Sequence, residues 1–214
     1  MYQINSFFFK FKFKIDTNNQ VVYKLGFIFF VFTFSTIYCQ DIPKQYSSYV
    51  FQLEGDLNGD LLKDSVVVKE NLQDKFNPYV LQIKFQQKDG SFKNALTSTK
   101  AVMEKFPYGD ARTETILEEL KIEKGILIFR NQQIRGSMTH KFRFQNGNFE
   151  LIGFSSSNAS PGYIEYVDYN LSTGTKIVRH NAYESDKVLL NKKMKEKPLK
   201  LPKLQDFEPF EFVY

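Results

Sequence analysis

The chain has 214 residues, of which 42% are hydrophobic and 25% charged, and this length suffices for one domain with a sizeable core. Residues 1–39 hold four Lys and one Asp, so that 25 basic and 23 acidic residues remain beyond them. This near balance is typical of a solvated surface and lacks the strongly basic character of a nucleic-acid-binding domain, so we expect no nucleic-acid partner.

Residues 1–39 are predicted to form a signal or leader segment. Leu25 to Tyr38 is an apolar run without charge, and it follows Lys24. A membrane span needs about 20 apolar residues, whereas a shorter run behind a basic residue is typical of a secretory signal. We therefore expect export to the periplasm or the extracellular space, with a mature domain that does not span the membrane. A membrane anchor, or a lipid attached to Cys39, are the alternatives.

Residues 40–196 are predicted to form a single β-rich domain, stabilised by its core because Cys39 is the only cysteine of the chain. Short β-rich runs follow one another at regular spacing, with Gly, Asn and Asp turn signals between them. This pattern favours a mainly β fold, either an antiparallel sandwich or a curled meander of hairpins with one or two short helices. An α+β fold is the alternative. The stretches that could hold helical turns are Thr99 to Lys105, Thr113 to Glu119 and Asp186 to Lys195.

The C-terminal residues 197–214 begin with Pro and Lys and end in the sequence FEPFEFVY. They are predicted to form an extended segment that packs its Phe residues on the domain.

Thr139 to Phe154 carries the strongest structural signal, that of a β-hairpin. Asn146-Gly147 can supply both positive-φ positions of a two-residue type I′ turn, and this sets the register. The predicted cross-strand pairs are Phe144–Phe149 and Phe142–Leu151 on one face and Arg143–Glu150 on the other. Continued outward, the same alternation places Ile152 and Phe154 on the Arg143 face, so we expect this end of the hairpin to be covered on both faces.

The acidic stretch from Asp56 to Asp64 has the spacing of a calcium loop. Hard Ca²⁺ prefers six to eight oxygen ligands, which alternate residues of a tight loop can turn inward. Leu61 stands where such loops have glycine, and the Glu that ends an EF-hand loop is missing at Val67. The alternative is an acidic turn held by Asx hydrogen bonds. The candidate calcium ligands are Asp56, Asn58, Asp60 and Asp64 through their side chains and Leu62 through its backbone carbonyl.

The two histidines, His140 and His180, each fall in a predicted strand. The expectation is a histidine at the edge of the core with a backbone partner, rather than a catalytic base. The tyrosines of Tyr163 to Tyr169 alternate between the two faces of another predicted strand. Exposed Tyr on a sheet can stack on sugars or peptides, although sheet-core tyrosines are at least as common.

Four stretches, GDLNGDLLKDSVVV, KGILIF, FRFQNGNFELIGFS and YNLSTGTK, occur here in this order. Together they resemble a family of exported bacterial β-rich proteins that have a D-x-N-x-D loop and an F-R-x-x-N-x-x-F-x-L-I-G hairpin. The resemblance covers roughly residues 48–180. It implies export and a β architecture, and it supplies no catalytic residues because that family has no established activity.

These observations support three hypotheses about function. The first is a secreted or periplasmic, non-enzymatic binding domain for a cell-surface or cell-wall ligand, because the chain has no catalytic motif such as a nucleophile elbow or a phosphate loop. The second is a hydrolase that acts on cell-envelope polymer with carboxylates or with His140 and His180. It requires the two histidines, or a histidine and a carboxylate, to lie close together in one cleft. The third is a structural surface protein tethered at its N-terminus. No catalytic residue is assigned, and calcium is the single cofactor considered.

Overall fold

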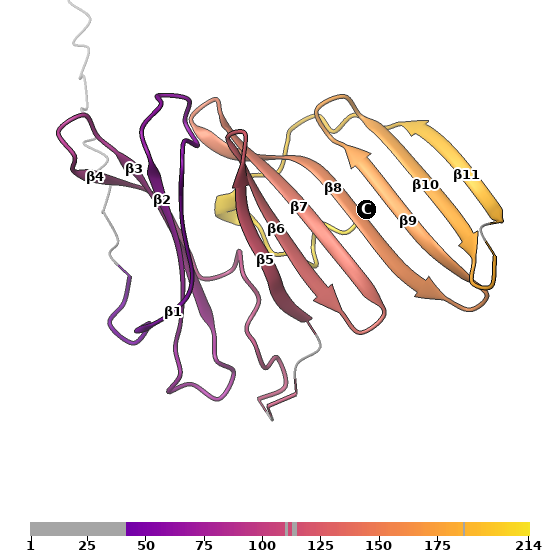
Figure 1. Cartoon of the computed structure of the whole chain (residues 1–214), viewed down its shortest axis with the longest axis horizontal. Coiled ribbons are helices and arrows are strands. Elements are labelled where there is room, and N and C mark those ends of the chain that lie inside the picture. Colours follow the sequence, from indigo (N-terminus) through magenta and orange to yellow (C-terminus); the bar gives the residue numbers. More distant parts are fainter. Residues whose placement is uncertain (1–41, 110, 113–114, 186) are drawn as a thin grey trace, which may run out of the picture. The chain divides into compact units, whose positions relative to one another are not determined.

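The computed structural model describes residues 42–214 with the exception of 110, 113–114 and 186, so the predicted leader lies outside the described residues. The described chain is mainly β and forms two antiparallel sheets, as Figure 1 shows. Their strand orders are β1-β2-β3-β4 and β11-β10-β9-β8-β7-β6-β5. Within each sheet, strands that are consecutive in sequence pair with one another, which confirms the predicted antiparallel β fold built from hairpins. No helix of the described residues is long and apolar enough to cross a membrane.

The strands of the four-stranded sheet are β1 Ser48–Gly55, β2 Asp64–Glu70, β3 Tyr79–Gln86 and β4 Phe92–Ser98. Those of the seven-stranded sheet are β5 Thr115–Glu123, β6 Ile126–Gln133, β7 Gly136–Gln145, β8 Asn148–Ser160, β9 Tyr163–Asn170, β10 Thr175–Ala182 and β11 Val188–Lys195. A short 3₁₀ helix, η1, spans Leu204–Asp206.

One hydrophobic core joins the two sheets. Alternate residues of β2 and β3 are fully buried together with Phe129 and Phe142 of the large sheet. Phe85 of β3 meets Phe144 of β7 edge to face, with 4.9 Å between the ring centroids. Such aromatic pairs contribute about 0.5–1.5 kcal/mol beyond the area that they bury. Aromatic residues of the predicted hairpin thus form part of the contact between the sheets.

The β7–β8 hairpin has the predicted register next to its turn. Phe144 faces Phe149, Phe142 faces Leu151 and Arg143 faces Glu150, while Asn146 and Gly147 both have positive φ. Further out the prediction was wrong. Lys141 pairs with Gly153 and not with Ile152, so Ile152 is the extra residue of a β-bulge. The bulge reverses the alternation, and Phe154 points into the core opposite His140.

The predicted helices are absent from the described residues. Thr99 to Lys105 is an irregular segment with bends, the described part of Thr113 to Glu119 enters β5, and the described part of Asp186 to Lys195 enters β11. Local helix propensity is weak in these short stretches. In the last two, pairing of β5 with β6 and of β11 with β10 satisfies the backbone groups instead.

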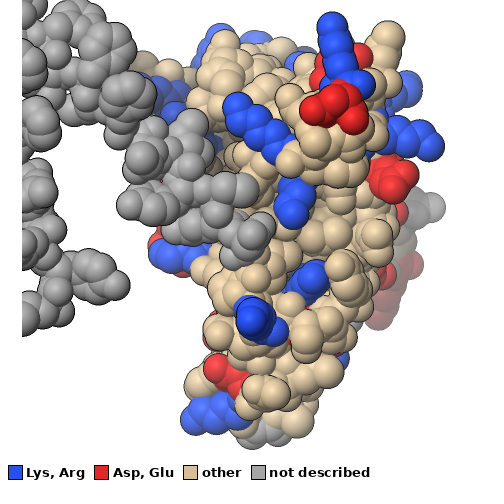
Figure 2. All heavy atoms as spheres, turned by 90° about the vertical axis from the view of Figure 1, so that its left-hand side faces the viewer, with Lys and Arg blue, Asp and Glu red and all other residues tan. Residues whose placement is uncertain are grey.

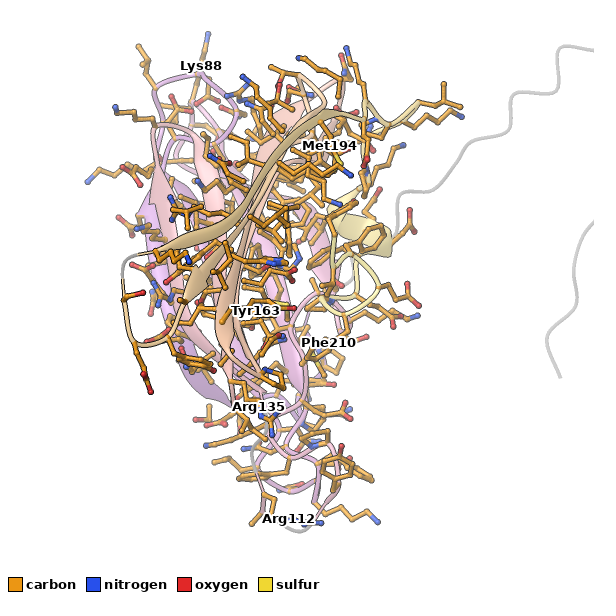
Figure 3. All side chains as sticks on the ribbon, turned by 90° about the vertical axis from the view of Figure 1, so that its right-hand side faces the viewer. Lys88, Arg112, Arg135, Tyr163, Met194 and Phe210 are labelled. Carbon is orange, nitrogen blue, oxygen red and sulfur yellow. The ribbon has the colours of Figure 1, made fainter. Side chains whose placement is uncertain are left out.

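The C-terminal segment packs on the inner face of the large sheet. Leu204 and Phe207 are fully buried, and the N–H of Leu151 in β8 donates to the carbonyl of Pro202. The ring of Tyr214 lies 5.4 Å from that of Phe154. Phe210 is an exception to the expected packing, since 46% of it is exposed. Figure 3 labels it in the segment beside the sheet.

Figure 2 shows the molecule from the side of the four-stranded sheet. Lys and Arg side chains are spread singly over this side, with uncharged surface between them. Lys69, for example, lies over the ring of Tyr49 at 4.2 Å from its centroid. This dispersed arrangement is that of an ordinary solvated surface.

Gly136, the first residue of β7, provides a test of the close approach between β7 and β8. A Cβ at this position would overlap the carbonyl oxygen of Ser157. We expect Gly136→Ala to lower the free energy of unfolding by about 2–3 kcal/mol, because backbone atoms must move to admit the methyl group. Gly153→Ala is the matched control, since a Cβ there meets Lys141 side-chain atoms no closer than 3.4 Å. Urea denaturation measures both, and equal losses would contradict the close approach.

Candidate functional site

An open groove runs along the outer face of the large sheet, the face that points away from the core. Its floor consists of four small hydroxyl side chains on two neighbouring strands. Ser137 and Thr139 of β7 stand opposite Ser157 and Ser155 of β8, so all four share one face. These side chains are short and longer side chains rise on the strands to either side, so the surface is hollowed where the four hydroxyls lie. Its volume is about 610 Å³.

Charged and aromatic side chains form the two walls. Arg130 of β6 stands beside Thr139, and its Nε donates to Glu118 at 2.9 Å. On the other side Tyr166 and Asp168 of β9 stand beside Ser157 and Ser155. The remaining wall residues lie on β10 and β11 and are Ile177, Arg179 and Asn191.

Arg179 is held over an aromatic ring. Its guanidinium carbon lies 5.0 Å from the ring centroid of Tyr166, its direct neighbour across β9 and β10. A cation over an aromatic face gains roughly 0.5–1 kcal/mol at an exposed site. The stack thereby restricts the direction in which the guanidinium presents its donors.

The chemistry of the groove is that of its lining side chains. Its lining contains serine and threonine hydroxyls but no histidine, lysine or cysteine. A serine hydroxyl is a weak nucleophile unless a neighbouring base takes its proton. The hydroxyls of the floor can both donate and accept hydrogen bonds, and they lie next to the aromatic ring of Tyr166.

The candidate calcium ligands lie elsewhere, in the loop between β1 and β2. The Asp56 carboxylate accepts the N–H groups of Gly59 and Leu61 at 2.7 and 2.9 Å, and Asp60 accepts that of Leu62 at 2.8 Å. The bond from Leu62 to Asp60 is that of an Asx turn, and the two bonds to Asp56 close the loop over a longer span. Leu61 has φ +68°, so it adopts the left-handed conformation in which such loops place glycine.

Asp64 differs from the other candidate ligands because it is fully buried at the start of β2. Its two oxygens accept the N–H groups of Leu57 at 2.8 Å and Gln86 at 3.1 Å, so the side chain ties the loop to β3. Burial raises its pKa, an effect that the two N–H groups partly offset. Among the described residues no three His, Cys, Asp or Glu side chains converge on a point that could hold a metal ion. Calcium binding stays a prediction.

The two histidines do not meet. His140 is fully buried, and its Nε2 lies 3.1 Å from the carbonyl oxygen of Phe212. His180 lies three strands away and further along the sheet, where its Nε2 is 2.9 Å from Glu165 and its ring stacks on Tyr163. His140 thus has the backbone partner expected from the sequence.

Rings of Phe154 and Phe207 pack against His140 with centroids 5.1 and 4.8 Å away. Burial among them lowers the pKa of His140 to about 4, and the carbonyl of Phe212 offsets this only in part. The neutral imidazole therefore donates from Nε2 to Phe212, while its Nδ1 is buried without a partner.

Sequence reasoning found one wall of the groove and missed the rest. The predicted alternation along Tyr163 to Tyr169 is confirmed, with Val167 and Tyr169 buried and Asp168 exposed on the other face. The available signal for the floor was the recurrence of Ser or Thr at alternate positions of two adjacent strands. It was hidden because the bulge at Ile152 reverses which residues of β8 face outward.

Comparisons with known proteins add no further information about this site. No family model, curated protein or solved structure matches the chain. The resemblance to exported bacterial proteins stays a prediction.

Thermal unfolding in the presence and absence of calcium tests the acidic loop. If the loop binds Ca²⁺, about 1 mM Ca²⁺ should raise Tm by roughly 5–10 °C relative to chelator, because only the folded state holds the ion. Asp60→Ala should abolish this shift. Asp60 is the better probe because its carboxylate bonds only within the loop, whereas Asp64 also holds β3. Asp89→Ala, which alters the acidic turn between β3 and β4, is the control. Equal Tm values with Ca²⁺ and chelator would leave a purely structural turn.

Protonation of His140 should destabilise the fold at acidic pH. Its pKa falls from 6.5 to about 4 on folding, so the folded state binds fewer protons than the unfolded chain. The contribution of the neutral histidine to stability is therefore fully present above the unfolded pKa of 6.5 and is lost as the pH falls towards 4. The free energy of unfolding should drop by about 2–3 kcal/mol between pH 7.5 and 4.5. Urea denaturation at these two pH values measures the loss. His140→Leu cannot take up the proton, so its free energy of unfolding should fall by about 2–3 kcal/mol less than that of the unchanged protein between the same two pH values. Equal losses in both proteins would show that His140 is not the group responsible.

Proposed function

We propose that this protein is an exported, non-enzymatic binding domain that takes a saccharide in the groove on its large sheet. Export rests on the apolar run Leu25 to Tyr38 behind Lys24. Binding rests on the groove itself, whose lining residues are brought to one face of the sheet by the pairing of the strands.

The observation that carries the proposal is the floor of four hydroxyls, bordered by Tyr166 and Arg179. A sugar presents many hydroxyl groups together with apolar C–H surfaces. It is therefore matched by small side chains that both donate and accept hydrogen bonds, next to an aromatic edge or face. Asp168 and Asn191 add an acceptor and an amide at the same wall. A purely apolar ligand would leave these polar groups without partners, which costs free energy.

Among the described residues, the groove lining holds a single carboxylate, Asp168, whereas glycoside hydrolysis generally uses a pair, and this favours binding over catalysis. The hydrolase hypothesis has one supporting observation, the His180–Glu165 pair with its 2.9 Å separation. That pair lies on the inner side of the sheet, so it cannot act on a ligand held in the outer groove. Turnover of a cell-wall polymer that is lost in His180→Ala would favour the hydrolase instead.

Binding of soluble oligosaccharides to the purified protein tests the proposal. We expect at least one member of a panel that comprises cellohexaose, chitohexaose and hexagalacturonate to bind. Tyr166→Ala should weaken that binding by about tenfold, because it removes the ring at the wall and releases Arg179. Isothermal titration calorimetry measures both proteins.

Two further variants sharpen this experiment. Ser155→Leu fills the floor and should block the groove, and because the half-buried Ser155 faces away from the core we expect the fold to stay intact. Tyr163→Ala is the matched control, since Tyr163 lies on the same strand as Tyr166 but on its opposite face. Binding that Tyr163→Ala and Tyr166→Ala weaken equally, or no binding to any of the three probes, would contradict the proposal.

A further inference from the structure

The outer face around the groove carries a concentration of positive charge. Strand register identifies which residues share this face, because directly opposite residues point to the same side. In the rows that cross or border the groove on β6 to β11, the basic residues are Arg130, Lys141, Arg179, Lys193 and Lys195 and the one acidic residue is Asp168. The ratio of basic to acidic residues is therefore far higher in these rows than in residues 40–214 as a whole.

Not all of these cations are free to meet a ligand. Arg130 is paired with Glu118, and the Nζ of Lys195 donates to Thr175 and to the carbonyl of Thr173. Lys141 lays its stem along Gly153. Arg179 stands apart, because among the described residues it has the Tyr166 ring as a neighbour but no carboxylate partner.

Arg179 therefore presents an uncompensated guanidinium at the wall of a groove that is otherwise built for hydroxyl groups. A guanidinium binds a carboxylate through two parallel N–H bonds, which are stronger and more directional than those to neutral oxygens. Its position over Tyr166 reduces the freedom that is lost on binding. Lys193, opposite Ile177 on β11, adds positive charge on the same side.

Asp168 limits the kind of anion that fits. It lies between the floor and Arg179's strand, opposite Ser155 on one side and Ile177 on the other. A densely charged chain such as a nucleic acid would bring its phosphates against this carboxylate. A sugar acid instead offers hydroxyl donors for Asp168 and Ser155, and places one carboxylate per residue.

We propose that the groove binds an acidic polysaccharide and that Arg179 recognises its carboxylate groups. This inference rests on the proposed saccharide function and adds the charge of the ligand to it. The hydroxyl floor and Asp168 pair with the ligand's hydroxyl groups, and Arg179 and Lys193 neutralise its carboxylates.

A matched pair of probes tests the charge separately from the sugar. Hexagalacturonate and its methyl ester have the same backbone, but the ester lacks the charges. We expect the purified protein to bind the acid at least about tenfold more tightly than the ester in calorimetry. Raising NaCl from about 0.05 M to about 0.5 M should weaken binding of the acid and leave binding of the ester little changed.

Arg179→Gln should remove the preference for the acid over the ester, because the affinity for the acid should fall to that for the ester. The matched control is Arg112→Gln, because Arg112 also lies over a tyrosine, with its guanidinium carbon 5.7 Å from the ring centroid of Tyr108. Figure 3 shows Arg112 at the lower tip of the molecule, beyond Arg135 of the β6–β7 turn. This variant changes the net charge equally and should keep the preference.

The outcomes separate the two proposals. Equal binding of acid and ester would overturn the inference and leave the saccharide function standing. Binding of neither, together with no binding of cellohexaose or chitohexaose, would overturn both. A single-stranded oligonucleotide of six phosphates that binds as tightly as hexagalacturonate, with the same dependence on Arg179, would identify a general polyanion site and also overturn the inference.

Discussion

The bulge at Ile152 is the constraint on which both faces of the large sheet depend. With uninterrupted alternation, Phe154 would face outward and Ser155 and Ser157 would face the core. The one extra residue reverses this order, so Phe154 is 1% exposed and the serines stand on the outer face. Burying two hydroxyls and exposing a large aromatic ring would both cost free energy. The bulge avoids both costs at the expense of one irregular pair of backbone hydrogen bonds.

The inner face that this bulge creates needs a cover, because the four-stranded sheet packs on only part of it. The C-terminal segment supplies the cover with Leu204 and Phe207, both fully buried. The fold has no disulfide to hold this segment, as Cys39 is the only cysteine. Its attachment therefore depends on packing and on hydrogen bonds, among them those from Leu151 to Pro202 and from His140 to Phe212. A neutral histidine is compatible with this environment, whereas a charged one is not, which couples the segment to pH.

The same alternation gives the outer face its character. Residues that do not face the core are free to be polar, and on β7 and β8 the four that form the floor of the groove are small as well. Smallness makes the groove, while Tyr166 and Arg179 limit it on one side. The groove and the buried His140 lie on opposite faces of the sheet. The His180–Glu165 pair shares the inner face, so none of the histidine chemistry suggested by the sequence is available to a ligand in the groove.

The sequence by itself determined the fold class, most strand positions and the hairpin register near its turn. These follow from local rules: a period of two in apolar residues, and glycine or asparagine where φ must be positive, as at Asn146-Gly147. Only the tertiary structure decided that Ile152 is bulged, that the described parts of Thr113 to Glu119 and Asp186 to Lys195 are strands, and that Ser155 and Arg179 share a groove. A bulge is set by which register buries more apolar surface against partners distant in sequence, and an edge segment becomes a strand when a neighbour offers its hydrogen bonds. Both are properties of packing between strands, which no local pattern contains.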